Sequence, residues 1–390
     1  MEEFEYDVVI VGCGVGGLYT ALNLSQNNKV LIITKADEIS SDSMLAQGGI
    51  CVLHDKDDYD AYFEDTMKAG HYENRQESVD IMIRSSRKII DDLLQRGVRF
   101  ARNDDGSLKY TREGAHSRPR ICFHEDITGK EITTTLLAEV KKMANVTIKE
   151  YVTMTDIIEE ARQCQGIKAV DRENKELLIK APFVVMATGG IGGLYEHSTN
   201  FPHLTGDACR IAKQHNIQLE HMDYVQIHPT SLYSEKAGRS FLISESARGE
   251  KAILLNNKKE RFVDELLPRD IVSKAIYEQM EKEGSKHVWM SFENVPDDII
   301  VQHFPHIQEK CLEEGYDILK EPIPIVPAQH YFMGGIHVNS DSETTMKNLF
   351  AVGETSCNGV HGKNRLASNS LLESLVFANR AAVEITRRMI

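Results

Sequence analysis

The sequence predicts an α/β fold in which a second domain is inserted into the first, and three observations support this prediction. A short apolar run at residues 6–11 leads directly into the glycine-rich turn G-C-G-V-G-G at residues 12–17 and then into a helix-like segment. Two further apolar strands, at residues 182–190 and 349–354, also end in glycine-containing turns although they lie far apart in the chain. Before the last of these strands, residues 222–331 differ in character, with polar loops and a Lys/Glu-rich helix.

The chain length also favours two domains, because 390 residues exceed the ~100–200 residues that one domain usually contains. We expect a Rossmann-like domain from residues 1–221 and 332–390, and an α+β capping domain from residues 222–331 that exits through the proline-rich segment 321–327. The patterns also predict strands at residues 29–33 and 147–157, and helices at residues 59–97 (broken near Gly70), 131–144, 271–284 and 370–389.

Composition and charge exclude several classes of protein. Hydrophobic residues make up 41% and charged residues 27%, which is typical of a folded globular chain. The net charge of −14 disfavours nucleic-acid binding, and no apolar run approaches the ~18 residues of a membrane span. Seven scattered cysteines without a C-x-x-C pair predict neither a disulfide framework nor a metal site. We therefore expect a cytoplasmic protein with no nucleic-acid or membrane partner and no metal.

The glycine turn at residues 12–17 predicts a dinucleotide site. Gly12 permits the tight turn, Gly14 lets the backbone approach a pyrophosphate, and Gly17 allows close packing of helix on strand. The motif alone is weak and also fits an ordinary strand–helix turn, but the strand–turn–helix–strand context favours binding. No acidic residue follows about 20 residues later. The next strand ends in Thr34-Lys35 instead, so Lys35 is a candidate for the adenine-side phosphate or sugar.

The segment S-S-D-S-M-L-A-Q-G-G-I at residues 40–50 is too polar and too rich in glycine for a strand. Its small residues suit a loop that wraps around a cofactor, and the alternative is an exposed surface loop.

Several motifs, in the same order along the chain, resemble the succinate dehydrogenase/fumarate reductase flavoprotein superfamily. They are A-Q-G-G at 46–49, A-T-G-G at 187–190, H-P-T at 228–230, R-G-E at 248–250, P-R-D at 268–270 and G-E at 353–354. Longer stretches at residues 111–117, 327–331 and 361–373 are similar to the L-aspartate oxidase family, and the resemblance extends from residue 6 to about 380.

This resemblance implies an FAD-dependent oxidation of L-aspartate. Hydride would pass from the aspartate Cα to flavin N5 and leave iminoaspartate, and the flavin would be reoxidised by O2 or fumarate. In the family this is the first step of de novo NAD biosynthesis, which implies a functional link to quinolinate synthase. Family members commonly carry a further C-terminal helical domain, and this chain stops at Ile390, so we expect a short form or a fragment.

The resemblance also implies that FAD is bound non-covalently. Membrane-complex members carry the histidine that bonds to the flavin five residues before the Gln of A-Q-G-G, and here that position is Asp42. The last helix would point its N-terminus at the flavin, where it stabilises the negative charge of the reduced form. The implied cofactor-binding residues are Gly12, Cys13, Gly14, Val15, Gly16, Lys35, Asp42, Ser43, Met44, Leu45, Ala46, Gln47, Gly48, Gly49, Asp207, Glu354, Ser370 and Leu371.

A four-carbon dicarboxylate needs a cationic or hydrogen-bond-donating cluster at each end. The resemblance places Gln226, His228 and Ser244 at one carboxylate, and His330 and Arg365 at the other. A guanidinium suits this role because it pairs with a carboxylate through two parallel bonds. A single histidine is more often an ordinary core or surface residue, so these assignments depend on the motifs around them.

Two further residues would determine the chemistry. The family places an arginine at Arg269 beside the reacting carbon, as the proton-transfer residue. A guanidinium is a poor base, so we expect a carboxylate relay from Glu250 or Asp270; the alternative for Arg269 is a structural salt bridge with Asp270 or Glu265. Glu113 would lie near the substrate amino group and favour aspartate over succinate, and the alternative is an exposed loop glutamate.

Two rival functions remain open from the sequence. A soluble fumarate reductase or succinate-oxidising flavoprotein would share the fold and Arg269. A catalytically silent flavoprotein would bind FAD without reacting with a dicarboxylate. In either case the capping domain is expected to close over the flavin as a lid.

Overall fold

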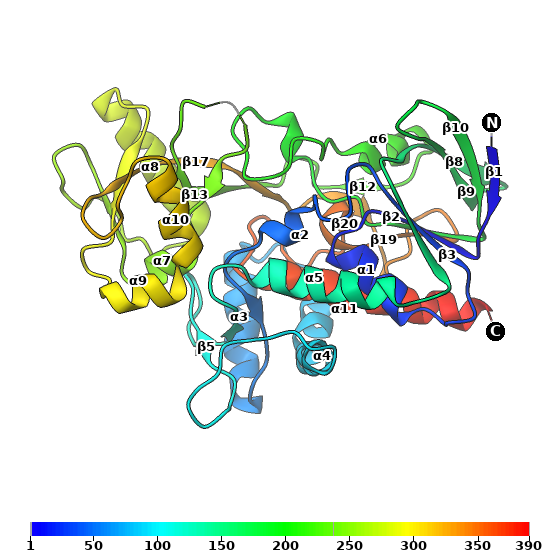
Figure 1. The fold of residues 1–390 in the computed structure, drawn as a ribbon, viewed down its shortest axis with the longest axis horizontal. Coiled ribbons are helices and arrows are strands. Elements are labelled where there is room, and N and C mark those ends of the chain that lie inside the picture. The colour runs from blue at the N-terminus through cyan, green and yellow to red at the C-terminus, as the bar shows by residue number, and fades with distance from the viewer. Residues whose placement is uncertain (1, 237, 390) are drawn as a thin grey trace.

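A five-stranded parallel sheet forms the centre of the larger domain (Figure 1). The structure is a computed structural model and describes residues 2–236 and 238–389. The sheet order is β19-β11-β2-β3-β7. Its strands are β2 (Val8–Val11), β3 (Val30–Thr34), β7 (Val146–Glu150), β11 (Phe183–Met186) and β19 (Leu349–Ala351). The Rossmann-like α/β fold that the sequence predicts is therefore present.

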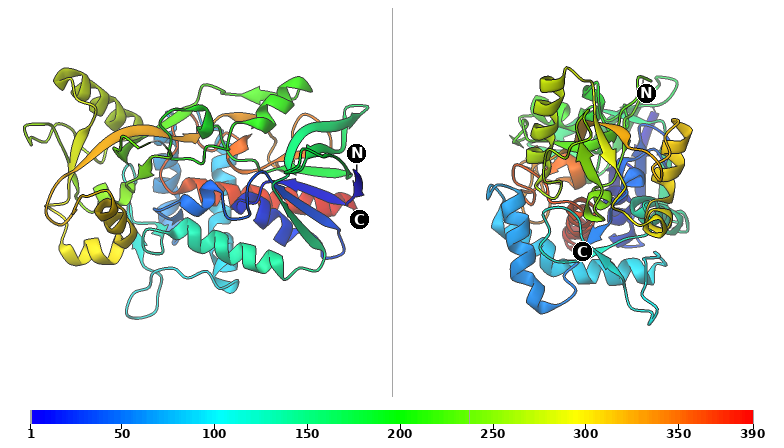
Figure 2. Two further views of the ribbon diagram at one scale, coloured as in Figure 1. Left: turned by 45° about the horizontal axis from the view of Figure 1, so that its top comes forward. Right: turned by 90° about the vertical axis from the view of Figure 1, so that its left-hand side faces the viewer.

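Both faces of this sheet are covered, which explains why its strands are continuously apolar. On one face, alternate strand residues pack against α1 (Val15–Asn23), α4 (Gln76–Gln95), α5 (Thr128–Lys141) and α11 (Asn369–Met389). Figure 2 shows α11 extending beside α1 along the domain. The other face packs against α6 (Asp207–Gln214) and a second sheet. That sheet has the order β1-β10-β9-β8.

The remaining helices and strands of the larger domain include the four strands of this second sheet. The helices are α2 (Asp42–Leu45) and α3 (Tyr59–Ala69). The strands are β1 (Glu2–Glu5), β4 (Ile50–Cys51), β5 (Tyr110–Thr111), β6 (Ile121–Cys122), β8 (Thr153–Glu160), β9 (Gln163–Val170), β10 (Glu176–Lys180), β12 (Leu219–Glu220), β18 (Gly335–His337) and β20 (Ser356–Cys357).

A mixed helix and sheet unit occupies the other end of the molecule, away from β1 and the end of α11 (Figure 1). Its antiparallel sheet has the order β14-β13-β17-β16-β15. The strands are β13 (Val225–Leu232), β14 (Phe241–Leu242), β15 (Ile253–Leu255), β16 (Val288–Ser291) and β17 (Ile323–Phe332). The helices are α7 (Glu245–Gly249), α8 (Arg269–Glu283), α9 (Asp297–His303) and α10 (Pro305–Glu313).

This unit has a hydrophobic core of its own, drawn from residues 232–325. We propose that it is the capping domain of residues 222–331, and the separate core supports that division. Its two long strands, β13 and β17, lead back to the larger domain, where Val225 and Phe332 pack into the core beneath the parallel sheet.

Most of the proline-rich exit segment is a strand, which the sequence analysis did not predict. Residues 323–327 form the first half of β17, the central strand of the capping sheet. Pro324 pairs with Trp289 of β16, and its carbonyl accepts a hydrogen bond from the backbone N–H of Tyr233. Pro327 falls where the register with β13 shifts, so its missing N–H leaves no gap in the ladder.

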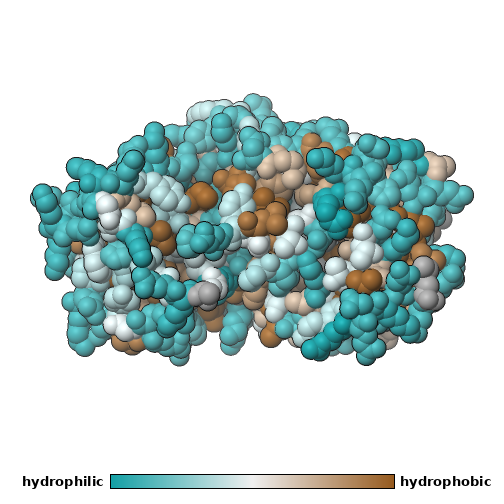
Figure 3. All heavy atoms as spheres, turned by 90° about the horizontal axis from the view of Figure 1, so that it is seen from above, coloured by the Kyte–Doolittle hydropathy of each residue, from teal (hydrophilic) through white to brown (hydrophobic). Residues whose placement is uncertain are grey.

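The surface seen in Figure 3 is mostly hydrophilic, with hydrophobic side chains gathered near the middle of that face. Among residues 2–236 and 238–389, none of the helices combines the length and the apolar character required to cross a membrane. The same residues contain no group of three or more His, Cys, Asp or Glu side chains arranged to hold a metal ion.

We predict that Phe304→Ala, which empties a buried site in the capping core, lowers the free energy of unfolding by about 3–5 kcal/mol. Limited proteolysis should then produce new cleavages within residues 222–331 while residues 1–221 resist. Phe377→Ala, in the core of the larger domain, is the matched control and should expose the other part of the chain. Equal cleavage of both parts in Phe304→Ala would contradict the proposed division.

Candidate active site

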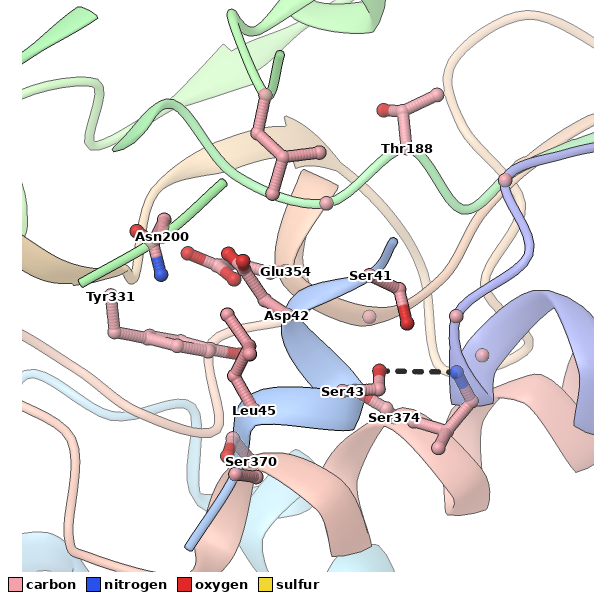
Figure 4. Close-up of a pocket in the computed structure, with 18 of the residues that line it drawn as sticks. Ser41, Asp42, Ser43, Leu45, Thr188, Asn200, Tyr331, Glu354, Ser370 and Ser374 are labelled. Carbon is pink, nitrogen blue, oxygen red and sulfur yellow. Dashed lines mark hydrogen bonds between the residues drawn. The ribbon is translucent and has the colours of Figure 1, made fainter. Parts of the chain in front are cut away.

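A large cavity begins at the carboxyl ends of β2, β3 and β11 and extends to the capping domain. This is the edge at which parallel sheets bind ligands. At one end it is lined by the glycine turn and α2, and at the other by residues from β13, α7, α8 and β17. Figure 4 shows the part around α2, where polar side chains from several segments project into the space.

The glycine turn has a backbone that only glycine accepts. Gly12 has a φ of +119°, and a Cβ there would lie 2.0 Å from the carbonyl oxygen of Ala187. A Cβ at Gly17 would lie 2.1 Å from the carbonyl oxygen of Gly12. Helix α1 begins after Gly14 without a side-chain cap, and the N–H of Val15 donates to Ser43 Oγ at 3.1 Å (Figure 4). The end of α1 is thus open to a phosphate group.

Lys35 and Asp207 meet at the β3 side of the cavity. Lys35 Nζ lies 2.6 Å from Asp207 Oδ2 and 3.0 Å from Thr205 Oγ1. The side chain of Lys35, predicted to contact the adenine side of the cofactor, is therefore held by Asp207 of α6, 172 positions later in the chain.

Two buried carboxyl groups, Asp42 and Glu354, project into the same part of the cavity (Figure 4). Burial raises the pKa of Asp42 to about 7. Burial, and then the charge of Asp42, raises the pKa of Glu354 to about 8. Glu354 Oε1 accepts a hydrogen bond from the N–H of Phe332, while Asp42 Oδ1 accepts one from the N–H of Phe201.

Unpartnered polar atoms show that this part of the cavity fits a polar ligand. Buried side-chain atoms without a hydrogen-bond partner include Ser41 Oγ, Asp42 Oδ2, Gln47 Oε1 and Asn200 Oδ1, all on lining residues. Together with the open end of α1, they match a ligand with phosphates and hydroxyl groups, such as a flavin dinucleotide.

The cavity brings together nearly all of the predicted cofactor-binding residues. Those lining it are Gly12, Cys13, Gly14, Val15, Gly16, Lys35, Asp42, Ser43, Leu45, Ala46, Gln47, Gly48, Gly49, Asp207, Glu354, Ser370 and Leu371. Met44 does not line it, and its sulfur faces Thr134 of α5 at 3.8 Å.

His228 offers a hydrogen-bond donor to the cavity. Its Nδ1 accepts the N–H of Thr230 at 3.2 Å, which leaves the ring proton of the neutral form on Nε2. That Nε2 is buried and has no partner. Burial, and then the charge of Arg269, holds the pKa of His228 well below its usual value. His330 packs edge-on against it, with ring centroids 4.9 Å apart.

Arg365 also lines this part of the cavity. Its Nη1 donates to Ser370 Oγ at 2.7 Å, and its guanidinium stacks 4.2 Å from the centroid of the Tyr331 ring. Its Nε has no partner. Burial, and then the charge of Arg269, lowers the pKa of Arg365 to about 10, so the group stays cationic at neutral pH.

Gln226 lies behind the cavity rather than on its wall. Its Oε1 accepts from Arg269 Nη1 at 2.9 Å, and its Nε2 donates to the carbonyl of Arg365 and to Asn364 Oδ1, each at 2.8 Å. The predicted substrate contact of Gln226 stays a prediction, and the structure gives it contacts that hold both arginines. Ser244 lines the cavity and caps α7, accepting the N–H of Ser246.

Arg269 is paired with Glu245, a residue that the sequence analysis did not identify. Arg269 Nε lies 2.5 Å from Glu245 Oε2, and Arg248 Nη2 lies 3.1 Å from the same oxygen. Burial acts to raise the pKa of Glu245, but Arg269 and Arg248 outweigh it and hold the pKa below its usual value. The spacing of Glu245 three residues before Arg248 was the available signal in the sequence.

The two relay candidates from the sequence lie elsewhere. Asp270 contacts His71 at 3.0 Å, and Glu250 lies 3.5 Å from His303. The structure thus replaces both with Glu245, because helix α8 turns the Asp270 side chain away from that of Arg269.

Glu113 is buried, not an exposed loop residue, with 3% of its surface accessible. It lines the same cavity as Arg269, Arg365 and the two histidines. Its Oε1 accepts from Ser246 Oγ at 2.8 Å and its Oε2 from Ser368 Oγ at 2.5 Å. Burial and then the charge of Glu245 raise the pKa of Glu113 above its usual value, although the two hydroxyl groups oppose this.

Comparison with known proteins adds three findings. The family model described as an FAD binding domain matches residues 7–371. L-Aspartate oxidases of Clostridium perfringens and Clostridium acetobutylicum are 50% and 49% identical over 380 residues, covering 97% of this chain and 86% and 87% of theirs. A structure of the E. coli quinol fumarate reductase subunit FrdA is similar with a TM-score of 0.92 and 32% identity. The match covers 100% of this chain and 71% of the FrdA chain.

The resemblance seen in the sequence, the lining of the cavity and these matches all indicate FAD as the cofactor and the same protein family. The chain therefore belongs to the FAD-binding L-aspartate oxidase family of the succinate dehydrogenase/fumarate reductase flavoprotein superfamily.

Proposed function

We propose that this chain is an FAD-dependent L-aspartate oxidase that converts L-aspartate to iminoaspartate. The observation that supports it best is the buried Glu113 carboxylate in the same cavity as the cations Arg269 and Arg365. A ligand with two carboxylates and one ammonium group complements that arrangement, because its ammonium group can pair with Glu113 while its carboxylates enter a cavity that carries two cations. FAD, when bound, supplies the hydride acceptor.

The residues around the cavity would hold both ends of a dicarboxylate. The guanidinium of Arg365 is cationic and has an unpartnered Nε for one carboxylate, and His330 lies near it. His228 Nε2–H and the Ser244 hydroxyl are donors for the other carboxylate. Both histidines are neutral, so they donate hydrogen bonds without adding buried charge.

Arg269 is the proton-transfer residue in this proposal. The substrate loses a proton as well as a hydride, and a guanidinium can accept that proton only by passing one of its own to a base beside it. The ionised Glu245, which contacts Arg269 Nε directly, would be that base. Arg248 contacts the same oxygen of Glu245, so two cations stabilise this carboxylate. Gln226 fixes the position of the guanidinium through Arg269 Nη1.

The cofactor would be held without a covalent bond. Asp42 occupies the position of the flavin-bonding histidine in membrane-complex relatives, and a carboxylate does not form that bond. The open end of α1 and the unpartnered atoms of Ser41 and Gln47 would bind the phosphates and hydroxyl groups.

The steps around the reaction are also proposals. O2 or fumarate would reoxidise the flavin, and the unstable imine would pass to quinolinate synthase in de novo NAD biosynthesis. We infer a cytoplasmic location from the seven buried cysteines, all of which are free thiols.

A fumarate reductase or succinate-oxidising activity is the alternative, since the E. coli quinol fumarate reductase shares the fold. Glu113 favours the aspartate reaction, because a buried carboxylate beside a substrate without an ammonium group would add only repulsion.

We predict that Arg269→Leu slows anaerobic flavin reduction by L-aspartate by roughly 100- to 10,000-fold, the usual range for loss of a proton-transfer group. FAD content should not change. Stopped-flow absorbance measures the rate. Arg87→Leu, on the exposed face of α4, is the control. If the flavin of Arg269→Leu were reduced at the wild-type rate, Arg269 would have no role in the mechanism.

Glu113→Gln should raise KM for L-aspartate by about ten- to a hundredfold, because a neutral amide loses the charge-assisted contact with the ammonium group. Fumarate has no such group, so its dissociation constant, measured from the perturbed flavin spectrum, should stay the same or fall. An equal loss for both ligands would contradict the role of Glu113 as the ammonium partner.

Acid denaturation of the purified protein should release all of its flavin into the supernatant. The reason is that Asp42 cannot form the histidyl bond. Flavin fluorescence that remains with the polypeptide on a denaturing gel would contradict non-covalent binding.

A further inference from the structure

The Glu113 carboxylate is held by one hydroxyl group from each side of the domain boundary. Ser368 belongs to the loop before α11 in the larger domain, and donates to Oε2. Ser246 belongs to α7, and donates to Oε1. Each oxygen of Glu113 thus depends on a different segment of the chain.

The contact with Ser246 is set by the short helix α7. Ser244 accepts the backbone N–H of Ser246, which fixes the first turn, and Glu245 follows Ser244 into the ion pair with Arg269. The same turn therefore positions a substrate residue, the carboxylate beside Arg269, and the hydroxyl on Glu113.

Close packing leaves Glu113 little freedom to find another partner. A Cβ at Gly48 would lie 2.2 Å from Glu113 Oε1, so that side of the carboxylate touches bare backbone. A Cβ at Gly114 would lie 2.4 Å from Glu245 Oε1, so the next residue is packed just as tightly against α7. The loop at Glu113 therefore packs closely against α7 of the capping domain.

We propose that Ser246 is a specificity-determining residue, whose hydroxyl orients the Glu113 carboxylate toward the substrate ammonium group when the capping domain is closed. The inference depends on the proposed function, since it assigns Ser246 a role in the recognition of aspartate by Glu113. Ser246 acts through Glu113 and is a positioning residue, not a catalytic one.

The hydrogen bond from Ser246 also affects the ionisation of Glu113. Burial and the charge of Glu245 raise the pKa of Glu113, while Arg269 and the two serine hydroxyls lower it. Arg248 and the thiol of Cys51 also interact electrostatically with the Glu113 carboxyl group. Loss of one hydroxyl would raise this pKa further, so the ionised form that attracts an ammonium group would appear only at higher pH.

The test compares Ser246→Ala with the wild-type holoenzyme. We expect KM for L-aspartate to rise by about tenfold with little change in kcat, as for one lost hydrogen bond to a charged group. The acidic limb of kcat/KM should move to higher pH. The dissociation constant of fumarate should stay the same or fall, because fumarate has no ammonium group to pair with Glu113. Ser246→Thr keeps the hydroxyl and should restore the KM of the wild type.

Ser285→Ala is the matched control, because it removes a hydroxyl at the far end of α8, bonded only to His287. FAD content and thermal unfolding of each variant detect misfolding. If Ser246→Ala binds aspartate and fumarate in the wild-type ratio with an unmoved pH profile, the inference is wrong while the proposed function stands. If aspartate fails to reduce the wild-type flavin and succinate succeeds, both are wrong.

Discussion

The structure depends on the compensation of charges buried where the two domains meet. Three guanidinium groups, of Arg248, Arg269 and Arg365, share this region with the carboxylates of Glu245 and Glu113. Burying a charge without a partner is costly, and among the described residues Arg365 has no carboxylate within ion-pair distance, so it favours a ligand with a negative group. An amino-dicarboxylate supplies a carboxylate for Arg365 and an ammonium group for Glu113.

The two separate cores explain how such a site is assembled. The parallel sheet and its helices hold the cofactor end of the cavity rigidly, with Gly12 and Gly17 bringing backbone into contact. The capping domain has its own core and carries Glu245 in the short helix α7 and Arg269 at the first residue of α8. Glu113 and Arg365 lie on the larger unit, and Glu245, Arg248 and Arg269 lie on the capping unit, so the site is complete only when the two units are associated.

Local patterns in the sequence accounted for most of the fold and for the cofactor end of the site. The strand, glycine turn and helix at the N-terminus are contiguous, so periodicity and glycine spacing were sufficient to identify them. Contacts between distant residues were not accessible in this way. The Glu245–Arg269 pair spans 24 positions and Ser246–Glu113 spans 133, and both depend on how α7 lies against the loop at Glu113. The strand character of residues 323–327 was not predicted, because it comes from pairing with β13 and β16, which overrides local propensity.

Anaerobic titration of the purified holoenzyme with L-aspartate tests the central claim most directly, with succinate titrated in parallel. The account predicts that L-aspartate abolishes the absorbance of the oxidised flavin, and that succinate does so far more slowly or not at all. Rapid bleaching by succinate with none by L-aspartate would contradict it, and would mean that the buried Glu113 does not select for an ammonium group.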